Sequence, residues 1–431
     1  MIKMNKLFLG FFVLAMLVGC KDKEVTTGIF SGIVTDATTS AALEGVQLII
    51  FNANTNSPAG ATKITDADGV FSVELDPGTY YAKLAKQGYY SVPPRGISAL
   101  PFEIFVDMEE VRDYELFAIE GATSFGWVTG QVTDGATGVA NVLVVLEGAD
   151  SYSSVTDNDG YYTINNVPGG SYQGKGWIAG YNSPGINVSV SANTESSGNN
   201  IALTAGANGV VSGSVKHLAT SNIDVDVALV HPVTRETIPG LTSFTQQDVY
   251  TISDVPNGIY LARATFENDQ RVMDPDAIAK FGEPVVTMPD PIDGSNVTIA
   301  FSVTNSVTLT SPTNVITSTI PVEVTSTTPT FEWVAYSSVS DYVIEVVDAA
   351  SGNVIWGGFS NNGGTVTKNI IIPSSQTSAV YNYDGNATVA SLVPGKIYSW
   401  RIYASKNVVS TGSWNLISAS EDQMGLIKIV P

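Results

Sequence analysis

The chain is poor in residues with reactive side chains. Its 431 residues include one cysteine and two histidines. No disulfide can therefore form within the chain, and no cluster of cysteine thiolates is available for a metal ion. Charged residues make up only 14% of the sequence, whereas Gly, Ser, Thr and Asn are abundant. This usage is typical of turn-rich β-domains rather than of helical proteins.

Positive charge is scarce as well. Lys and Arg together number 20 against 41 Asp and Glu, which gives a formal net charge of -21. Nucleic acid needs a basic surface to neutralise its phosphates, so this composition excludes it as a partner. The length of the chain predicts about three or four domains.

The N-terminus has the pattern of an export signal. Lys3 and Lys6 precede an apolar stretch over 7–18, which is shorter than the roughly 20 apolar residues that a membrane-spanning helix needs. The stretch ends in Leu17-Val18-Gly19-Cys20, which resembles the lipobox of bacterial lipoproteins. The resemblance implies that Cys20 becomes the acylated first residue of the mature chain, so that a membrane is one partner. The alternative is an ordinary signal peptide followed by an accidental cysteine.

A short charged segment follows Cys20. It reads Lys21-Asp22-Lys23-Glu24 and resembles the export signals that place some Bacteroidetes lipoproteins on the outer face of the outer membrane. Four charged residues also occur in ordinary solvated linkers. We expect a lipid-anchored protein of the outer membrane, displayed at the cell surface or alternatively facing the periplasm, with 20–28 as its tether.

The sequence repeats itself three times. Each copy has a glycine-containing strand, a second apolar strand, a turn before an aromatic strand, a Pro-to-Tyr segment and a closing strand, in the same order. The turns are Thr65–Phe71, Thr156–Tyr162 and, more loosely, Thr245–Tyr250, and the segments after them are Pro77–Tyr80, Pro168–Tyr172 and Pro256–Tyr260. Asp-Gly and Pro-Gly steps supply the positive φ that hairpins need, so the pattern predicts small antiparallel β-sandwiches, each long enough to close its own core.

The order of these landmarks resembles the carboxypeptidase regulatory-like domain family. That family has a transthyretin-like sandwich of seven strands, which is also grouped with carbohydrate-binding-like folds. The resemblance covers 29–118 and 127–204, with a divergent third copy over 209–305 that has Gln246, Gln247 and Asp248 in place of the Asp-x-Asp-Gly turn. It implies an all-β protein of tandem sandwiches.

Two segments interrupt this plan. In the third copy, Asp274 as a cap, Pro275 in the first turn and Gly282 as a stop predict a short inserted helix over 273–282, as a lid on the sandwich end or as a binding site. Residues 306–328 are rich in Thr, Ser, Val and Pro and are interpreted as a connecting strand or linker.

The last segment, 329–431, starts a new pattern. A tryptophan on an early strand, Trp333, and a tyrosine after a Pro-Gly step, Tyr398, are similar to those of fibronectin type III domains. We expect a fibronectin type III-like or immunoglobulin-like sandwich here.

Catalytic chemistry is not recognisable. Neither His217 nor His231 has a glutamate at the spacing of a zinc site, and no nucleophile elbow accompanies them. The repeats resemble the accessory module of zinc peptidases, and the chain has no room for the catalytic domain. We expect a protein that is not an enzyme and that needs no cofactor.

The Asp-x-Asp-Gly turns have two interpretations. Asp66 and Asp68 in the first copy, and Asp157 and Asp159 in the second, are hard oxygen ligands of the kind that Ca²⁺ prefers. The favoured interpretation is a turn in which the aspartate accepts hydrogen bonds from local backbone amides and the glycine takes a positive φ.

Aromatic side chains supply the remaining candidate site. Tyr89, Tyr90, Trp177 and Tyr181 fall near the loop that follows the Pro-to-Tyr strand, where sugar rings could stack on exposed rings. Packing in the core is the favoured alternative. The function predicted from the sequence is a binding, adhesion or scaffold protein with a glycan or protein ligand, and the alternative is a glycan-binding component of a polysaccharide uptake system.

Overall fold

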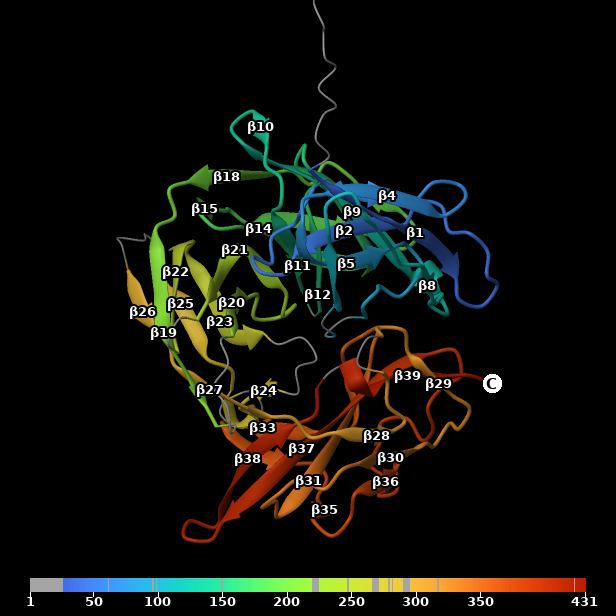
Figure 1. Ribbon diagram of the computed structural model, residues 1–431, viewed down its shortest axis with the longest axis vertical. Coiled ribbons are helices and arrows are strands. Elements are labelled where there is room, and N and C mark those ends of the chain that lie inside the picture. Colours follow the sequence, from blue (N-terminus) through green and yellow to red (C-terminus); the bar gives the residue numbers. More distant parts are fainter. Residues whose placement is uncertain are drawn as a thin grey trace, which may run out of the picture.

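The structure is a computed structural model, shown in Figure 1. It describes residues 26–431 except 61, 95–96, 98, 149, 219–224, 246–247, 266–270, 278–279, 281, 290–294, 316–317 and 422. Apart from the 3-10 turns η1 (Ala122–Ser124), η2 (Pro275–Ala277) and η3 (Gln423–Gly425), the elements in these ranges are all β-strands. No helix in the described ranges is long and apolar enough to cross a membrane. The all-β prediction of tandem sandwiches is therefore confirmed.

The first repeat forms two facing sheets. One has the order β4-β1-β7, with β8 also paired to β1, and the other has the order β3-β2-β5-β6. Their bounds are β1 (Gly28–Asp36), β2 (Gln47–Asn52), β3 (Lys63–Ile64), β4 (Val70–Leu75), β5 (Gly78–Ala85), β6 (Pro101–Ile104), β7 (Glu109–Val111) and β8 (Tyr114–Leu116). Side chains alternate along β1, so Phe30 and Val34 are buried between the sheets while Ile29 and Ile33 face outward.

The second repeat has the same strand order. Its sheets are β13-β9 with β17 and β18, and β12-β11-β14-β16. Their bounds are β9 (Phe125–Asp134), β10 (Thr137–Gly138), β11 (Leu143–Glu147), β12 (Ser151–Val155), β13 (Tyr161–Pro168), β14 (Gly170–Trp177), β15 (Tyr181–Asn182), β16 (Ile186–Val190), β17 (Glu195–Ser196) and β18 (Ile201–Ala205).

The third repeat follows the same plan despite its divergent turn. Strands β22, β26 and β27 pair with β19, and the second sheet has the order β21-β20-β23-β25. Their bounds are β19 (Gly209–His217), β20 (Asp226–Val230), β21 (Thr237–Phe244), β22 (Val249–Val255), β23 (Gly258–Thr265), β24 (Arg271–Met273), β25 (Val285–Met288), β26 (Asn296–Thr298) and β27 (Phe301–Asn305).

The C-terminal sandwich places the sheet β28-β30-β36 against a larger sheet, β29-β39-β37-β31-β32, to which β35 and β38 add. Their bounds are β28 (Leu309–Ser311), β29 (Val322–Val324), β30 (Thr330–Trp333), β31 (Asp341–Asp348), β32 (Val354–Gly357), β33 (Phe359–Asn362), β34 (Thr365–Lys368), β35 (Ile372–Pro373), β36 (Ser378–Val380), β37 (Ile397–Val408), β38 (Ser413–Ala419) and β39 (Leu426–Ile429). The segment 306–328, interpreted from the sequence as a connecting strand or linker, supplies β28 and β29. It does so because Val307 and Leu309 are buried in this core with Trp333 and Trp400.

The three repeats share one large hydrophobic cluster. Each closes an inner core, but the outward faces of two sheets continue into the core of the third repeat. Members of the cluster are Ile49, Phe51 and Tyr81 of the first repeat, Leu143, Val145 and Trp177 of the second, and Val227, Leu229 and Tyr260 of the third. The repeats therefore form one packed body.

The C-terminal sandwich contacts both the first and the third repeat. Tyr90 and Phe117 of the first repeat pack with Ile397 and Leu426. In the third repeat the predicted inserted helix is a single 3-10 turn in the described residues, where Asp274 Oδ1 accepts the Asp276 N–H at 3.1 Å. Asp276 Oδ1 in turn accepts the Leu416 N–H at 2.6 Å, so the insert joins two sandwiches.

Candidate functional site

The floor of the candidate site is the outward face of the first repeat's second sheet. Leu48 and Ile50 of β2 fill the inner core, so alternation turns Gln47, Ile49 and Phe51 outward. In the antiparallel register these three face Ala85, Lys83 and Tyr81 of β5. The floor thus carries apolar, aromatic and polar side chains in two adjacent rows.

A cavity of ≈ 620 Å³ lies over this floor. Its walls come from β12 of the second repeat, from the approach to β21 in the third, and from the 348–351 loop and Lys396 of the C-terminal sandwich. Four parts of the chain that are distant in sequence therefore enclose one volume. Its size falls in the range of small-molecule sites.

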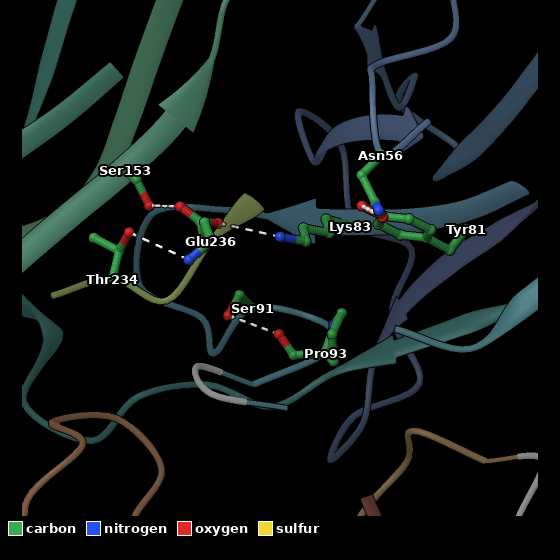
Figure 2. Close-up of polar contacts among 8 residues, drawn as sticks. All are labelled: Asn56, Tyr81, Lys83, Ser91, Pro93, Ser153, Thr234 and Glu236. Carbon is green, nitrogen blue, oxygen red and sulfur yellow. Dashed lines mark hydrogen bonds and ion pairs between the residues drawn. The ribbon is translucent and has the colours of Figure 1, made fainter. Parts of the chain in front are cut away.

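Glu236 links three repeats at the cavity wall. Its carboxylate lies 3.2 Å from Lys83 Nζ of the first repeat and accepts a hydrogen bond from Ser153 Oγ of the second. Figure 2 shows Glu236 between these two side chains, with Thr234 on the same loop. The side chains of Lys83 and Glu236 are 33% and 27% exposed. The pair therefore remains accessible to a bound molecule.

Two aromatic rings form the apolar part of the floor. Phe51 and Tyr81 stack with their centroids 5.0 Å apart and their planes at 5°. The Tyr81 hydroxyl donates to Asn56 Oδ1 at 3.2 Å, as Figure 2 shows. Lys83 Nζ lies 5.2 Å from the centroid of Phe51. The rings thus pack against one another and against the side chains of Asn56 and Lys83.

Gln47 contributes an acceptor that has no partner in the described part of the chain. The residue is 8% exposed and lines the cavity, and its Oε1 atom accepts no hydrogen bond from the described residues. A buried acceptor without a partner is destabilised by about 1–3 kcal/mol. A ligand with a hydroxyl or amide donor would relieve that cost, so Gln47 makes the cavity a candidate binding site.

Two of the four aromatic residues predicted from the sequence as a sugar-stacking site are buried between sandwiches. Trp177 is 6% exposed, and its ring makes edge contacts with His231 and Tyr260 of the third repeat at 5.3 and 5.5 Å. Tyr90 is 5% exposed against the C-terminal sandwich. Trp177 offers no free face to a sugar, because it is buried between the second and third repeats and does not line the cavity. These two positions are therefore interdomain core residues.

Tyr89 and Tyr181 are half-buried. The Tyr89 hydroxyl donates to Asp36 Oδ2 at 3.1 Å, and burial raises its pKa. The Tyr89 carbonyl accepts from Asn166 Nδ2 of the second repeat at 2.9 Å. Tyr181 packs at the edge of the second repeat's core. Tyr89 and Tyr90 also line the cavity, but sequence reasoning assigned them to a separate loop site.

The Asp-x-Asp-Gly turns have the geometry of plain turns. Asp66 Oδ1 accepts the N–H groups of Asp68 and Val70 at 3.0 and 2.8 Å. Asp157 Oδ1 does the same for Asp159 and Tyr161 at 3.0 and 2.8 Å. No group of three or more metal-binding side chains occurs in the described ranges. Cys20, the predicted lipidation site, lies outside the described residues.

Sequence reasoning missed the cavity, although a signal was present. Strand β2 is buried at five successive positions, Gln47 to Phe51. A strand that is buried on both faces reads as a continuous apolar run rather than as an alternating one. The run Leu48-Ile49-Ile50-Phe51 therefore indicates that a second layer covers the outer face.

The first repeat matches a known protein family. Residues 29–101 match the carboxypeptidase regulatory-like domain family. The resemblance drawn from the landmarks is thus confirmed for that repeat. No curated protein sequence matches the chain.

Several solved structures match the chain at low identity and low TM-score. The Bacillus anthracis TIE protein matches at 15% identity and TM-score 0.18, over 64% of this chain and 50% of that one. BcpA, the major pilin subunit of Bacillus cereus, matches at 12% identity and TM-score 0.19, over 65% and 100%. The shaft pilin SpaA of Lactobacillus rhamnosus GG matches at 11% identity and TM-score 0.18, over 42% and 98%. The chain thus spans half the length of the TIE protein.

Proposed function

We propose that the protein is a non-catalytic lipoprotein of the outer membrane, anchored through Cys20, that acts as a binding, adhesion or scaffold protein. Its three repeats and its fibronectin type III-like C-terminal sandwich present one packed unit at the cell surface. The cavity between the sandwiches is the ligand site. Gln47 carries this proposal, because its buried acceptor lines the cavity and accepts no hydrogen bond from any residue that the structure describes.

The arrangement of the walls supports binding rather than chemistry. Lys83 and Glu236 neutralise one another at 3.2 Å, and Lys396 lies 3.1 Å from Asp348 on the wall from the C-terminal sandwich. Paired charges of this kind orient polar groups of a ligand. Because the walls belong to separate sandwiches, a ligand in the cavity would also stabilise their packing.

The alternative to a protein ligand is a glycan. The edges of the largely buried rings of Phe51 and Tyr81 line the cavity, and Gln47, Asn56 and Glu236 place acceptors around them. Sugars present C–H faces and many hydroxyl donors at once. This combination favours a role as a glycan-binding component of a polysaccharide uptake system.

Two experiments test the proposal. Cys20→Ser should release the protein from the membrane fraction after a high-salt wash, since the unacylated chain has no lasting anchor. Protease added to intact cells should digest the wild-type protein if it is displayed at the surface. A Cys20→Ser protein that stays in the membrane pellet would refute the lipid anchor.

The ligand is sought with full-length Cys20→Ser protein on an array of defined polysaccharides, and by protein pull-down from intact cells. Gln47→Leu and Glu236→Ala should each abolish the binding that is found. Gln376→Leu is the matched control, because Gln376 is exposed on the C-terminal sandwich and lies outside the cavity. Binding that is unchanged in both cavity variants would place the ligand elsewhere.

A further inference from the structure

The turn between β6 and β7 of the first repeat is unusually apolar for an exposed turn. It consists of Phe105, Val106, Asp107 and Met108. The three apolar residues are 53%, 48% and 59% exposed. A cluster of large apolar side chains at a loop tip marks an interaction site, because water does not favour it.

The second repeat contains the same turn without large apolar residues. Its turn between β16 and β17 reads Ser191-Ala192-Asn193-Thr194. Asp107 N–H donates to Thr27 O at 3.0 Å, and Asn193 N–H donates to Phe125 O at 3.0 Å. These two residues also share a positive φ, 60° and 53°. The backbone of the turn therefore does not require apolar side chains.

The position of the turn explains the difference between the repeats. The Asp107 N–H bonds the carbonyl of Thr27, at the point where the described chain begins. Cys20 precedes Thr27 by seven residues, which reach at most about 25 Å even when fully extended. An acyl chain on Cys20 would therefore hold this turn close to the bilayer. The turn of the second repeat has no such proximity to the anchor in sequence.

We propose that the turn 105–108 docks into the membrane surface beside the lipid anchor, with Phe105, Val106 and Met108 entering the interfacial region. This inference rests on the proposed acylation of Cys20. The partner surface is electrically neutral or zwitterionic, because Glu103, Asp107 and Glu109 surround the apolar side chains and would repel anionic lipid. Docking of the turn fixes the orientation of the first repeat on the membrane, as well as its distance.

The test uses the full-length acylated protein in phosphatidylcholine vesicles. Acylation occupies the sulfur of Cys20, the one cysteine of the chain, so an introduced cysteine can be labelled alone. A polarity-sensitive fluorophore is attached to Met108→Cys, and nitroxide lipids in the bilayer serve as quenchers. Asn193→Cys carries the same fluorophore on the equivalent turn of the second repeat. We expect several-fold stronger quenching at position 108 than at position 193.

A turn exchange supplies the matched variant. Phe105→Ser, Val106→Ala and Asp107→Asn are combined with the labelled Met108→Cys, because the second repeat folds with that sequence. Quenching at position 108 should then fall to the level at position 193. Vesicles containing anionic phosphatidylglycerol should quench position 108 less than phosphatidylcholine alone.

The quenching experiment distinguishes a failure of the turn to dock from a failure of the lipid anchor at Cys20. Equal quenching at 108 and 193 in protein that floats with the vesicles overturns the docking of the turn and leaves the anchor intact. Unaltered quenching in the exchanged turn overturns it as well. Protein that does not float, and whose Cys20 reacts with the thiol label, overturns both proposals.

Discussion

The Nε2 atom of His231 lies 2.8 Å from Oε1 of Glu147, across the boundary between the second and third repeats. The backbone N–H groups of Val233 and Thr234 donate to Nδ1 of the same ring at 3.3 and 3.2 Å. Nδ1 is therefore an acceptor, so Nε2 carries the proton and donates to Glu147. His231 is fully buried, which makes this hydrogen bond part of the packing between repeats.

This bond predicts a loss of stability in acid. The hydrogen bond from His231 lowers the pKa of Glu147 below its ordinary value of 4.5. The stabilisation from the carboxylate is therefore complete above pH 4.5 and is lost as the pH falls through the lowered value. Glu147→Gln should reduce the drop in melting temperature between pH 6 and pH 3. Glu103→Gln, at an exposed position, should leave that drop unchanged.

The packing of Trp177 predicts that the second and third repeats stabilise one another. Trp177→Ala should cost about 3–5 kcal/mol in the free energy of unfolding, because a buried ring is removed. Tyr161→Ala, at a residue that is 56% exposed, should change it by less than about 0.5 kcal/mol. The fragment 125–305 should melt at a higher temperature than the fragment 125–205. Equal melting temperatures for the two fragments would contradict the shared core.

A tyrosine hydroxyl recurs at one position in all three repeats. Tyr80, Tyr172 and Tyr260 donate to the carbonyl four residues earlier at 2.9, 2.9 and 2.8 Å. Tyr260 is the most deeply buried. Tyr260→Phe should cost about 0.5–1.5 kcal/mol in a denaturant titration, since one hydrogen bond is lost. Tyr161→Phe serves as the exposed control, and an equal effect in both variants would rule out the hydrogen bond as the cause.

The geometry of the Asp157 turn predicts that a side chain at Gly160 destabilises the fold and that the stability of the fold does not depend on calcium. Gly160 has a φ of +80°, and an added Cβ would lie 2.4 Å from the Val132 carbonyl oxygen. Gly160→Val should therefore cost more than Gly198→Val, whose φ of +74° is similar but whose Cβ would meet nothing within 4 Å. The difference should exceed about 1 kcal/mol, as overpacking does. Excess chelator should leave the melting temperature unchanged, whereas bound calcium would add roughly 2.7 kcal/mol at 100 times its dissociation constant.

The burial of Asp226 predicts that the folding stability decreases as the pH rises. Burial raises its pKa to about 6 from an ordinary 3.8. The fold therefore prefers the protonated acid, and stability is lost as the pH rises through 6. Asp226→Asn should raise the melting temperature at pH 8 and have less effect at pH 4. Asp254→Asn is the control, because Asp254 is exposed and asparagine tolerates its φ of 58°. A gain of the same size at both pH values would show that burial of the charge is not responsible.

Much of the fold follows from interactions that are local in sequence. Asp157 bonds the amides two and four residues ahead, and Tyr260 bonds a carbonyl four residues back. Residue types at fixed short spacings were therefore enough to predict the repeats and their strands. The Asp274 cap could also be predicted from the sequence. The length of the helix after it could not, because Asp276 of η2 accepts a hydrogen bond from Leu416 of another sandwich.

The candidate site depended on contacts between distant segments. The sequence by itself determined that β2 and β11 are apolar on both faces, and hence that something covers their outer sides. Only the tertiary structure decided that the third repeat covers them, that Trp177 and Tyr90 are buried between sandwiches, and that Gln47 and Glu236 meet at one cavity. The reason is physical. The apolar pattern of a strand records how much of it is buried, whereas its partner is selected by the complementarity of whole surfaces brought together from far along the chain.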